Sequence, residues 1–240
     1  MFSANWWETR SSGGRFGIHI GLNAPRIASR RRTKKRSQRR CTLKITFENT
    51  KKLPETMSSS NDVSSVLTTY TKCINFAAVK HRNQRRLDSD KTPYINHPIG
   101  VAQILTAEGD ITDFEVIQAA ILHDTVEDTD TTFEELEREF GYAVRRLVEE
   151  VTDDKTLPKA ERKRLQIEHA AGTSPQAKLV KLADKIYNLR DLQRCRPEGW
   201  TEERCRDYFT WAKRVCEGLR GTNQALEGIL DEIFKQEGVE

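Results

Sequence analysis

The 240-residue chain is poor in cysteine and contains no long hydrophobic run. Its five cysteines are scattered, odd in number and without any Cys-x-x-Cys spacing, so the sequence predicts neither a disulfide framework nor a thiolate zinc site. They are Cys41, Cys73, Cys195, Cys205 and Cys216. No apolar segment approaches the roughly 20 residues that a membrane span needs, and residues 1–10 lack the apolar core of a secretory signal. These absences predict a protein of a reducing compartment, cytoplasmic by default, with no membrane partner.

Alternating hydrophobic patterns of strand length are also nearly absent. Residues 42–47 are the one segment with a convincing alternation. From residue 62 onward, apolar residues recur instead at three and four positions, which is the spacing of one helix face. The sequence therefore predicts an all-α fold class without internal repeats.

Positive charge is concentrated at the start of the chain. The first 57 residues hold fourteen basic and three acidic residues, a net charge of +11, whereas the whole chain carries only +4. Residues 58–240 therefore carry −7. A basic segment with no sustained apolar period cannot bury enough surface to offset its ordering entropy, so we expect a disordered basic N-terminal arm over 1–57 and a folded domain over 58–240.

Three interpretations of the arm compete. It can be a patch that binds nucleic acid or directs nuclear import, an Arg-rich mitochondrial presequence, or an addition upstream of a translation start at Met57. The last two are favoured, because Trp6, Trp7 and Phe16 are separated from the basic cluster rather than interleaved with it. A mitochondrial location is expected only if the arm is a presequence.

Apolar periodicity divides the rest of the chain into helices. Asp62 can cap the first, which we expect to end in the basic run 81–86, and Pro98 can occupy the first turn of the second. The other helices are expected at 114–123, from 131 to a stop at Gly141, and at 141–151, 159–170, 176–194, 202–218 and 223–236.

Local capping chemistry marks several of these helix starts. Thr112 with Glu115, and Thr131 with Glu134, have the spacing of capping boxes. Ser174 precedes a proline, so it is expected to cap the long helix that follows.

The first candidate site residues are His123 and Asp124, at the end of an apolar helix. At a helix terminus the backbone can splay, so that an imidazole and a carboxylate address one cation. A His-Asp pair alone also occurs by chance at solvated helix ends. Glu127 and Asp128, each four residues further on, favour a metal site because two more carboxylates can position or deprotonate an attacking water.

Two further places carry candidate chemistry. His97 stands alone in the chain, and its ordinary alternative is a core histidine bonded to a backbone carbonyl. Asp184 and Asn188, four residues apart, share one face of the expected long helix beside its apolar stripe. The alternative for Asp184 is a salt bridge to Lys181 or Lys185.

Taken together, these motifs have the order and spacing of a known family. They are Asn-His-Pro at 96–98, His-Asp at 123–124 with Val-Glu-Asp-Thr at 126–129, and Leu-Ala-Asp-Lys at 182–185 with Asn188. They resemble the HD-type hydrolase domain of the RelA/SpoT family of (p)ppGpp enzymes, and most of all its small, free-standing metazoan members, over about residues 63–234. The resemblance implies an HD-domain helical bundle with no synthetase domain.

The resemblance implies a metal site and a catalytic pair. The implied ligands are His97, His123, Asp124 and Asp184, with Mn²⁺ as the usual metal and Glu127 and Asp128 as the catalytic acids. Two imidazoles and two carboxylates suit Mn²⁺, Zn²⁺ or Fe²⁺ about equally, so the chain itself does not select the metal.

The resemblance and the charge pattern also indicate substrate-binding residues. Arg86 and Asn188 match residues of the family's nucleotide site, whereas Leu87 stands where the family usually has a second base. A multiply charged phosphate ester needs further cations. The candidates are Lys159 and Lys163, and Arg204 with Tyr208, which can flank a purine or ribose.

The expected activity is metal-dependent hydrolysis of a nucleotide that carries a phosphorylated ribose. For ppGpp the reaction releases pyrophosphate from the 3′ position, and the metazoan members also resemble enzymes that remove the 2′-phosphate of NADPH. The alternative is a non-catalytic nucleotide sensor or interaction protein that keeps the fold. The acid pair Glu127 and Asp128 favours the enzyme, because a sensor has no evident need to activate water.

Overall fold

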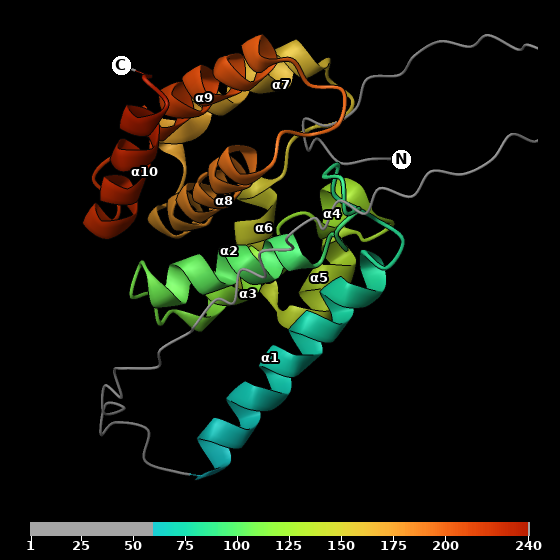
Figure 1. Ribbon diagram of the computed structural model, residues 1–240. Coiled ribbons are helices and arrows are strands. Elements are labelled where there is room, and N and C mark those ends of the chain that lie inside the picture. The colour runs from blue at the N-terminus through green and yellow to red at the C-terminus, as the bar shows by residue number, and fades with distance from the viewer. Residues whose placement is uncertain (1–59, 240) are drawn as a thin grey trace, which may run out of the picture. The chain divides into compact units, whose positions relative to one another are not determined.

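A computed structural model of the protein describes residues 60–239. Within that range the chain is helical and contains no strand, only an isolated bridge between Arg85 and Pro93, so the predicted all-α class is confirmed. The elements are α1 (Ser60–Lys80), α2 (Asn96–Ala107), α3 (Phe114–Leu122), α4 (Thr125–Asp128), α5 (Phe133–Phe140), α6 (Tyr142–Val151), α7 (Lys159–His169), η1 (Ala170–Gly172), α8 (Pro175–Arg194), α9 (Glu202–Glu217) and α10 (Gln224–Gln236) (Figure 1). The predicted arm 1–57, its proposed roles and the strand at 42–47 lie outside the described residues.

Helices α3 and α8 form the centre of the bundle. α8 contacts α2, α3, α6, α9 and α10, and α3 in turn contacts α1, α2 and α6 (Figure 1). α3 is apolar around most of its circumference, and every residue from Val116 to Leu122 is buried, which is the pattern of a helix enclosed by neighbours. Side chains at the ends of these two helices are therefore held by the core.

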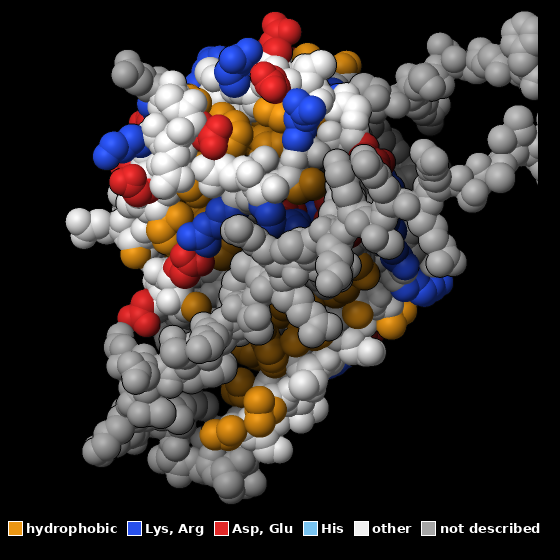
Figure 2. All heavy atoms as spheres, viewed as in Figure 1, with side chains coloured by type: hydrophobic (Ala, Val, Ile, Leu, Met, Phe, Trp, Pro, Cys, Tyr) orange, Lys and Arg blue, Asp and Glu red, His pale blue; other side chains and the backbone are white. Residues whose placement is uncertain are grey.

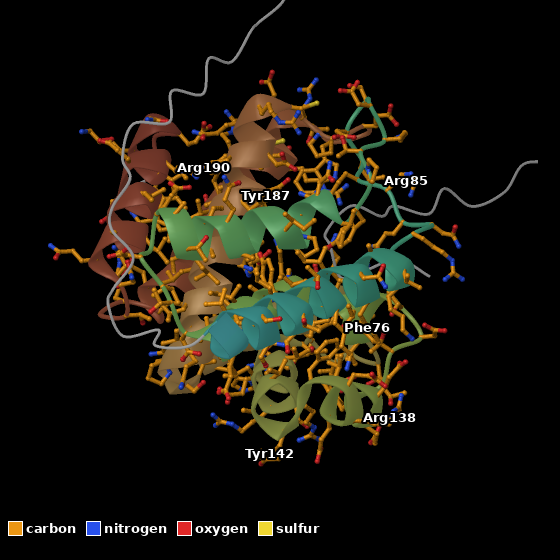
Figure 3. All side chains as sticks on the ribbon, turned by 90° about the horizontal axis from the view of Figure 1, so that it is seen from below. Phe76, Arg85, Arg138, Tyr142, Tyr187 and Arg190 are labelled. Atoms are coloured by element: carbon orange, nitrogen blue, oxygen red, sulfur yellow. The ribbon has the colours of Figure 1, made fainter. Side chains whose placement is uncertain are left out.

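A glycine brings α2 close to α8. A Cβ atom at Gly100 would lie 2.1 Å from the ring of Tyr187, so only glycine lets that ring rest against α2. Figure 3 shows Tyr187 beside α2. The same ring packs edge-on against His97, with centroids 4.8 Å apart. The close approach therefore places the amino end of α2 against the middle of α8.

Most helix boundaries agree with the prediction, and two caps shift by one residue. Ser174 caps α8 as expected, and Gly141, with φ of 89°, ends α5. The predicted capping boxes are wrong in detail: Asp113 rather than Thr112 caps α3, and Thr132 rather than Thr131 caps α5. In each case the neighbouring side chain satisfies the exposed N–H groups of the first turn.

The first helix differs more. It begins at Ser60 and ends at Lys80, so the basic run 81–86 is not helical. There the backbone pairs with the returning chain instead: Arg86 N donates to Thr92 O at 2.8 Å, and Tyr94 N donates to Gln84 O at 3.1 Å. These hydrogen bonds join residues six and ten positions apart and replace the bonds of a helix. A local sequence pattern does not reveal them.

The first turns of α1 extend away from the core. Val63, Val66 and Leu67 are exposed, and Figure 2 shows hydrophobic side chains at the lower end of the view, where α1 begins. Cys73 is the first buried residue in the described part of this helix. Across residues 60–239, none of the helices combines the length and the apolar character needed to cross a membrane.

Candidate active site

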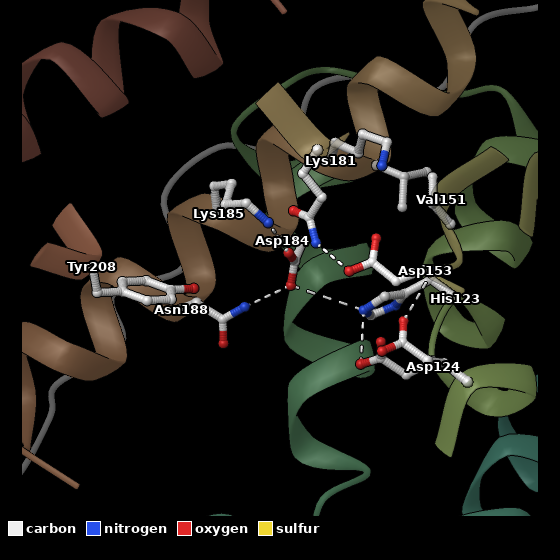
Figure 4. Close-up of a pocket in the computed structure, with 12 residues that line it drawn as sticks. His123, Asp124, Val151, Asp153, Lys181, Asp184, Lys185, Asn188 and Tyr208 are labelled. Carbon is white, nitrogen blue, oxygen red and sulfur yellow. Dashed lines mark hydrogen bonds and ion pairs between the residues drawn. The ribbon is translucent and has the colours of Figure 1, made fainter. Parts of the chain in front are cut away.

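Four side chains from different elements converge at the centre of the bundle. His97 is the second residue of α2, His123 and Asp124 form the turn between α3 and α4, and Asp184 lies in α8. The Nε2 atoms of His97 and His123 are 3.3 Å apart, and Asp184 Oδ1 lies 3.2 Å from His97 Nε2. Asp124 Oδ2 lies 2.9 Å from His123 Nε2 and 3.5 Å from His97 Nε2. Figure 4 shows His123, Asp124 and Asp184 turned toward one another.

The backbone hydrogen bond of His123 turns its other ring nitrogen toward the donor cluster. Its Nδ1 lies 2.7 Å from the carbonyl oxygen of Ala120, which only accepts, so Nδ1 carries the proton. Nε2 then faces His97 and the two carboxylates, and its lone pair is open to a cation once the proton held there is displaced. A backbone carbonyl behind a histidine is the usual support of a metal-ligating imidazole.

The donor set fits a divalent cation. His97, His123 and Asp184 each offer one atom within 4.8 Å of the others. Two donors bound at about 2.0–2.2 Å to one ion lie roughly 3–4 Å apart, which matches the observed separations. Lone pairs and carboxylate oxygens gathered this closely repel one another unless a positive charge lies among them. Asp184 also forms the predicted alternative contact, an ion pair with Lys185 at 2.9 Å.

Charge in the cluster is strongly coupled. Burial alone would raise the pKa of Asp184, but Lys185 and the imidazole of His97 hold that pKa far below its ordinary value. Burial would likewise lower the pKa of His123, yet the carboxylate of Asp124 raises it to about 9. Without a cation the imidazole therefore keeps a proton that a metal ion has to displace.

The two predicted catalytic acids follow in α4, and they face different surroundings. Glu127 lines the same cavity as His123, Asp124 and Asp184, and its Oε2 accepts from the backbone N–H of Asp153 at 3.3 Å. Burial and the nearby carboxylate of Asp124 raise the pKa of Glu127 well above its ordinary value.

Asp128 lines a neighbouring cavity instead. Gln84 Nε2 donates to its Oδ2 at 2.8 Å, and Lys155 Nζ lies 2.9 Å from its Oδ1. Burial and the charge of Asp124 raise its pKa to about 6. The two acids, adjacent in one short helix, thus line two different cavities.

Arg86 reaches the donor cluster through Asn188. The guanidinium is only 4% exposed, donates to Asn188 Oδ1 at 2.9 Å, and forms an ion pair with Asp191 at 2.9 Å. Asn188 Nδ2 in turn donates to Asp184 Oδ1 at 2.7 Å. Leu87, the departure from the family pattern, is partly buried beside these residues, and its carbonyl accepts from Glu198 N at 3.1 Å.

The remaining predicted substrate residues gather where α7 faces α9. Lys163 Nζ lies 4.9 Å from the ring centroid of Trp211, and the Arg204 guanidinium lies 4.2 Å from that of Trp200. Burial, followed by repulsion from Lys159, lowers the pKa of Lys163 to about 8. Tyr208 is buried beside both tryptophans and lines the metal-site cavity. The four residues therefore form a basic and aromatic wall between α7 and α9, and Tyr208 connects this wall to the cavity of the donor cluster.

Sequence reasoning missed Lys181 as a residue of the cavity. Lys181 lines the cavity together with Glu127 and Asp184. Figure 4 shows Lys181 on the same helix as Asp184. Within residues 60–239 no hydrogen bond or ion pair joins its ammonium group to another side chain. Burial, followed by repulsion from Lys185, lowers its pKa. The signal was present in the spacing, because Lys181, Asp184 and Asn188 recur every three to four residues along one face of α8.

Comparison with known proteins agrees with this geometry. A family model described as the HD domain matches residues 73–210, more than half of the chain. The guanosine-3′,5′-bis(diphosphate) 3′-pyrophosphohydrolase MESH1 of Xenopus tropicalis is 64% identical over 180 residues, which are 75% of this chain and 98% of the relative. The chain belongs to the MESH1 family of metazoan SpoT homologues.

Other MESH1 proteins give the same picture. The human protein of that name is 68% identical over 165 residues, which cover 69% of this chain and 92% of the relative. The solved structure of a metazoan SpoT orthologue that hydrolyses ppGpp superposes with a TM-score of 0.71 at 59% identity, covering 72% of this chain and 97% of the other. The described bundle is therefore the HD domain of this family, whose donor cluster calls for a divalent metal.

Proposed function

We propose that this MESH1-family chain hydrolyses the 3′-diphosphate of ppGpp, taking up one water and releasing GDP and pyrophosphate. The observation that carries the proposal is that His123, Asp124 and Asp184 line one cavity with Glu127, while the buried His97 adjoins them with its Nε2 3.3 Å from that of His123. The same activity is named for relatives that this chain matches over 92–98% of their length.

The metal proposed for the cluster is Mn²⁺. Two imidazole nitrogens and two carboxylate oxygens are borderline-hard donors, which also accept Zn²⁺ or Fe²⁺. When bound, such an ion lowers the pKa of water and neutralises charge on phosphate oxygens. His97 and Asp184 supply donors from α2 and α8, and His123 and Asp124 supply donors from the turn after α3.

Glu127 is proposed to take a proton from the attacking water. Its carboxylate lies in the cavity of the donor cluster, and its raised pKa makes it more basic than an ordinary glutamate. The N–H of Asp153 fixes one oxygen of the carboxylate. Asp128 is proposed to support the same step from the neighbouring cavity, where Lys155 and Gln84 hold it.

The negatively charged phosphate groups of the substrate are proposed to bind to the basic and aromatic wall between α7 and α9. Lys159, Lys163 and Arg204 present three cationic groups there, and their mutual repulsion is relieved when an anion binds. Tyr208, whose ring packs at a tilt against Trp200 and Trp211, lines the cavity of the donor cluster. The guanidinium of Arg86 is buried, so Arg86 is proposed to affect the substrate indirectly, by holding the side chain of Asn188.

The test is turnover by the full chain. Incubation with Mn²⁺ and ppGpp is expected to release pyrophosphate, and a parallel incubation with NADPH measures release of phosphate. Glu127→Gln should lower kcat by about 10²–10⁴-fold while leaving the fold intact, because it removes the proposed proton acceptor but keeps the shape. Asp184→Ala should abolish both Mn²⁺ binding and turnover. Wild-type turnover no higher than that of these variants would favour the non-catalytic nucleotide sensor.

A further inference from the structure

The connection between α1 and α2, residues 81–95, carries three side chains that none of the site predictions includes. His81 and Tyr94 are each 2% exposed, and Gln84 is partly buried. The connection doubles back on itself, because Tyr94 N donates to Gln84 O at 3.1 Å and His97 N donates to Tyr94 O at 2.9 Å. The backbone therefore fixes Gln84 and Tyr94 side by side, next to the start of α2.

Tyr94 holds the acid that precedes α4, and Gln84 holds the acid that ends it. The hydroxyl of Tyr94 donates to Asp124 Oδ2, the same oxygen that lies 2.9 Å from His123 Nε2. Gln84 Nε2 donates to Asp128 Oδ2 at 2.8 Å. Because a carboxylate oxygen only accepts, the Tyr94 hydroxyl is the donor of this bond.

His81 contacts both Gln84 and Tyr94. Its Nδ1 lies 2.7 Å from Gln84 Oε1, and since an amide oxygen only accepts, this bond turns the amide nitrogen toward Asp128. The imidazole also packs on the ring of Tyr94, with centroids 4.9 Å apart. Within residues 60–239 its Nε2 has no hydrogen-bond partner, so Gln84 and the Tyr94 ring are what orient it.

We propose that His81, Gln84 and Tyr94 form a positioning clamp for the active site. Tyr94 fixes Asp124 among the metal donors, Gln84 fixes Asp128, and His81 joins the two. Groups that orient a metal ligand from behind typically change metal affinity or activity by about 10–100-fold when they are removed. The role of Gln84 rests on the proposed hydrolase function, whereas the role of Tyr94 rests on the donor cluster alone.

The first test measures metal binding without turnover. Calorimetric titration of the full chain with Mn²⁺ is expected to show Kd raised about tenfold or more in Tyr94→Phe, which keeps the ring but loses the donor. Tyr187→Phe is the matched control, since its ring also packs on His97 while its hydroxyl contacts none of the four donors, and its Kd should match the wild type. An unchanged Kd in Tyr94→Phe would overturn the metal half of the clamp.

The second test separates chemistry from binding. Gln84→Met conserves volume and is expected to lower kcat for ppGpp about tenfold, with KM and the Kd for Mn²⁺ within twofold of the wild type. Gln84→Glu places a like charge against Asp128 and should lower kcat further. An unchanged kcat in both variants, or an equal loss of metal affinity, would show that Gln84 only supports the loop. If the wild type itself is inactive, the proposed function fails and the Mn²⁺ titration still decides the role of Tyr94.

Discussion

Individual residues of α8 make different contributions to the site. Asp184 contributes a carboxylate oxygen to the donor cluster, Lys185 balances its charge, and Asn188 links it to Arg86. Lys181 differs from these, because its ammonium lines the cavity without a direct partner among residues 60–239. It therefore has a positive charge to offer to an arriving phosphate.

Lys181→Met tests that role. We expect kcat/KM for ppGpp to fall about tenfold while the Kd for Mn²⁺ changes less than twofold, because one phosphate-facing cation is lost and no metal donor is disturbed. Lys178→Met, one helical turn earlier on the same helix and outside the cavity, is the control. Equal kinetics in the two variants would remove Lys181 from the substrate site.

At the scale of elements, the connection 81–95 is held together in part by one ionised side chain, that of Asp88. Asp88 accepts from Thr92 N at 2.9 Å and from Thr92 Oγ1 at 2.6 Å. Burial would raise its pKa, but these two hydrogen bonds and Arg194 hold it below the ordinary value. A folded-state pKa that is depressed stabilises the fold above the unfolded-state pKa near 4, and this stabilisation is lost as the pH falls through the folded-state value.

The corresponding prediction compares wild type with Asp88→Asn. At pH 7 the variant should melt about 2–4 °C lower, since a hydrogen bond to a charged acceptor is worth roughly 1 kcal/mol or more. The difference should shrink steadily below pH 4 as Asp88 is protonated. Thermal melts at pH 7, 4 and 3 measure it, and a difference as large at pH 3 as at pH 7 would show that charge on Asp88 is not the cause.

The elements also show which features the sequence reveals. Ser174 and Gly141 were predictable because a cap or a stop depends on a few neighbouring residues. The end of α1 was not, because Gln84 and Arg86 bond to backbone that lies six to ten residues further along the chain. Tyr94 stayed hidden for a related reason: its contact with Asp124 exists only after α2 and α3 have packed.

At the scale of the whole molecule, the metal site and the core share the same helices. Donors from α2, α8 and the turn after α3 are held by side chains buried in the bundle. An ion that binds only the folded protein stabilises it by mass action. The four donors themselves could be proposed from sequence because the family's motifs are local, whereas their separations required the fold.

Removal of the metal is therefore expected to lower the melting temperature. At a Mn²⁺ concentration 100 times Kd, binding adds about 2.7 kcal/mol, or roughly 5–10 °C for a domain of this size. Differential scanning calorimetry with Mn²⁺ and with a chelator measures the shift, and Asp184→Ala should show none. A wild-type melt that is insensitive to the chelator would contradict a divalent ion at the donor cluster.

Lys181, Asp184 and Asn188 lie on a helix whose other face fills the core. The chemistry of the site therefore depends on the helical register of α8. One inserted residue ahead of Asp184 would swing everything beyond it by about 100°, so that the stripe facing the core and the groups facing the cavity would both be lost at once. We therefore expect that α8 tolerates substitutions much better than insertions or deletions.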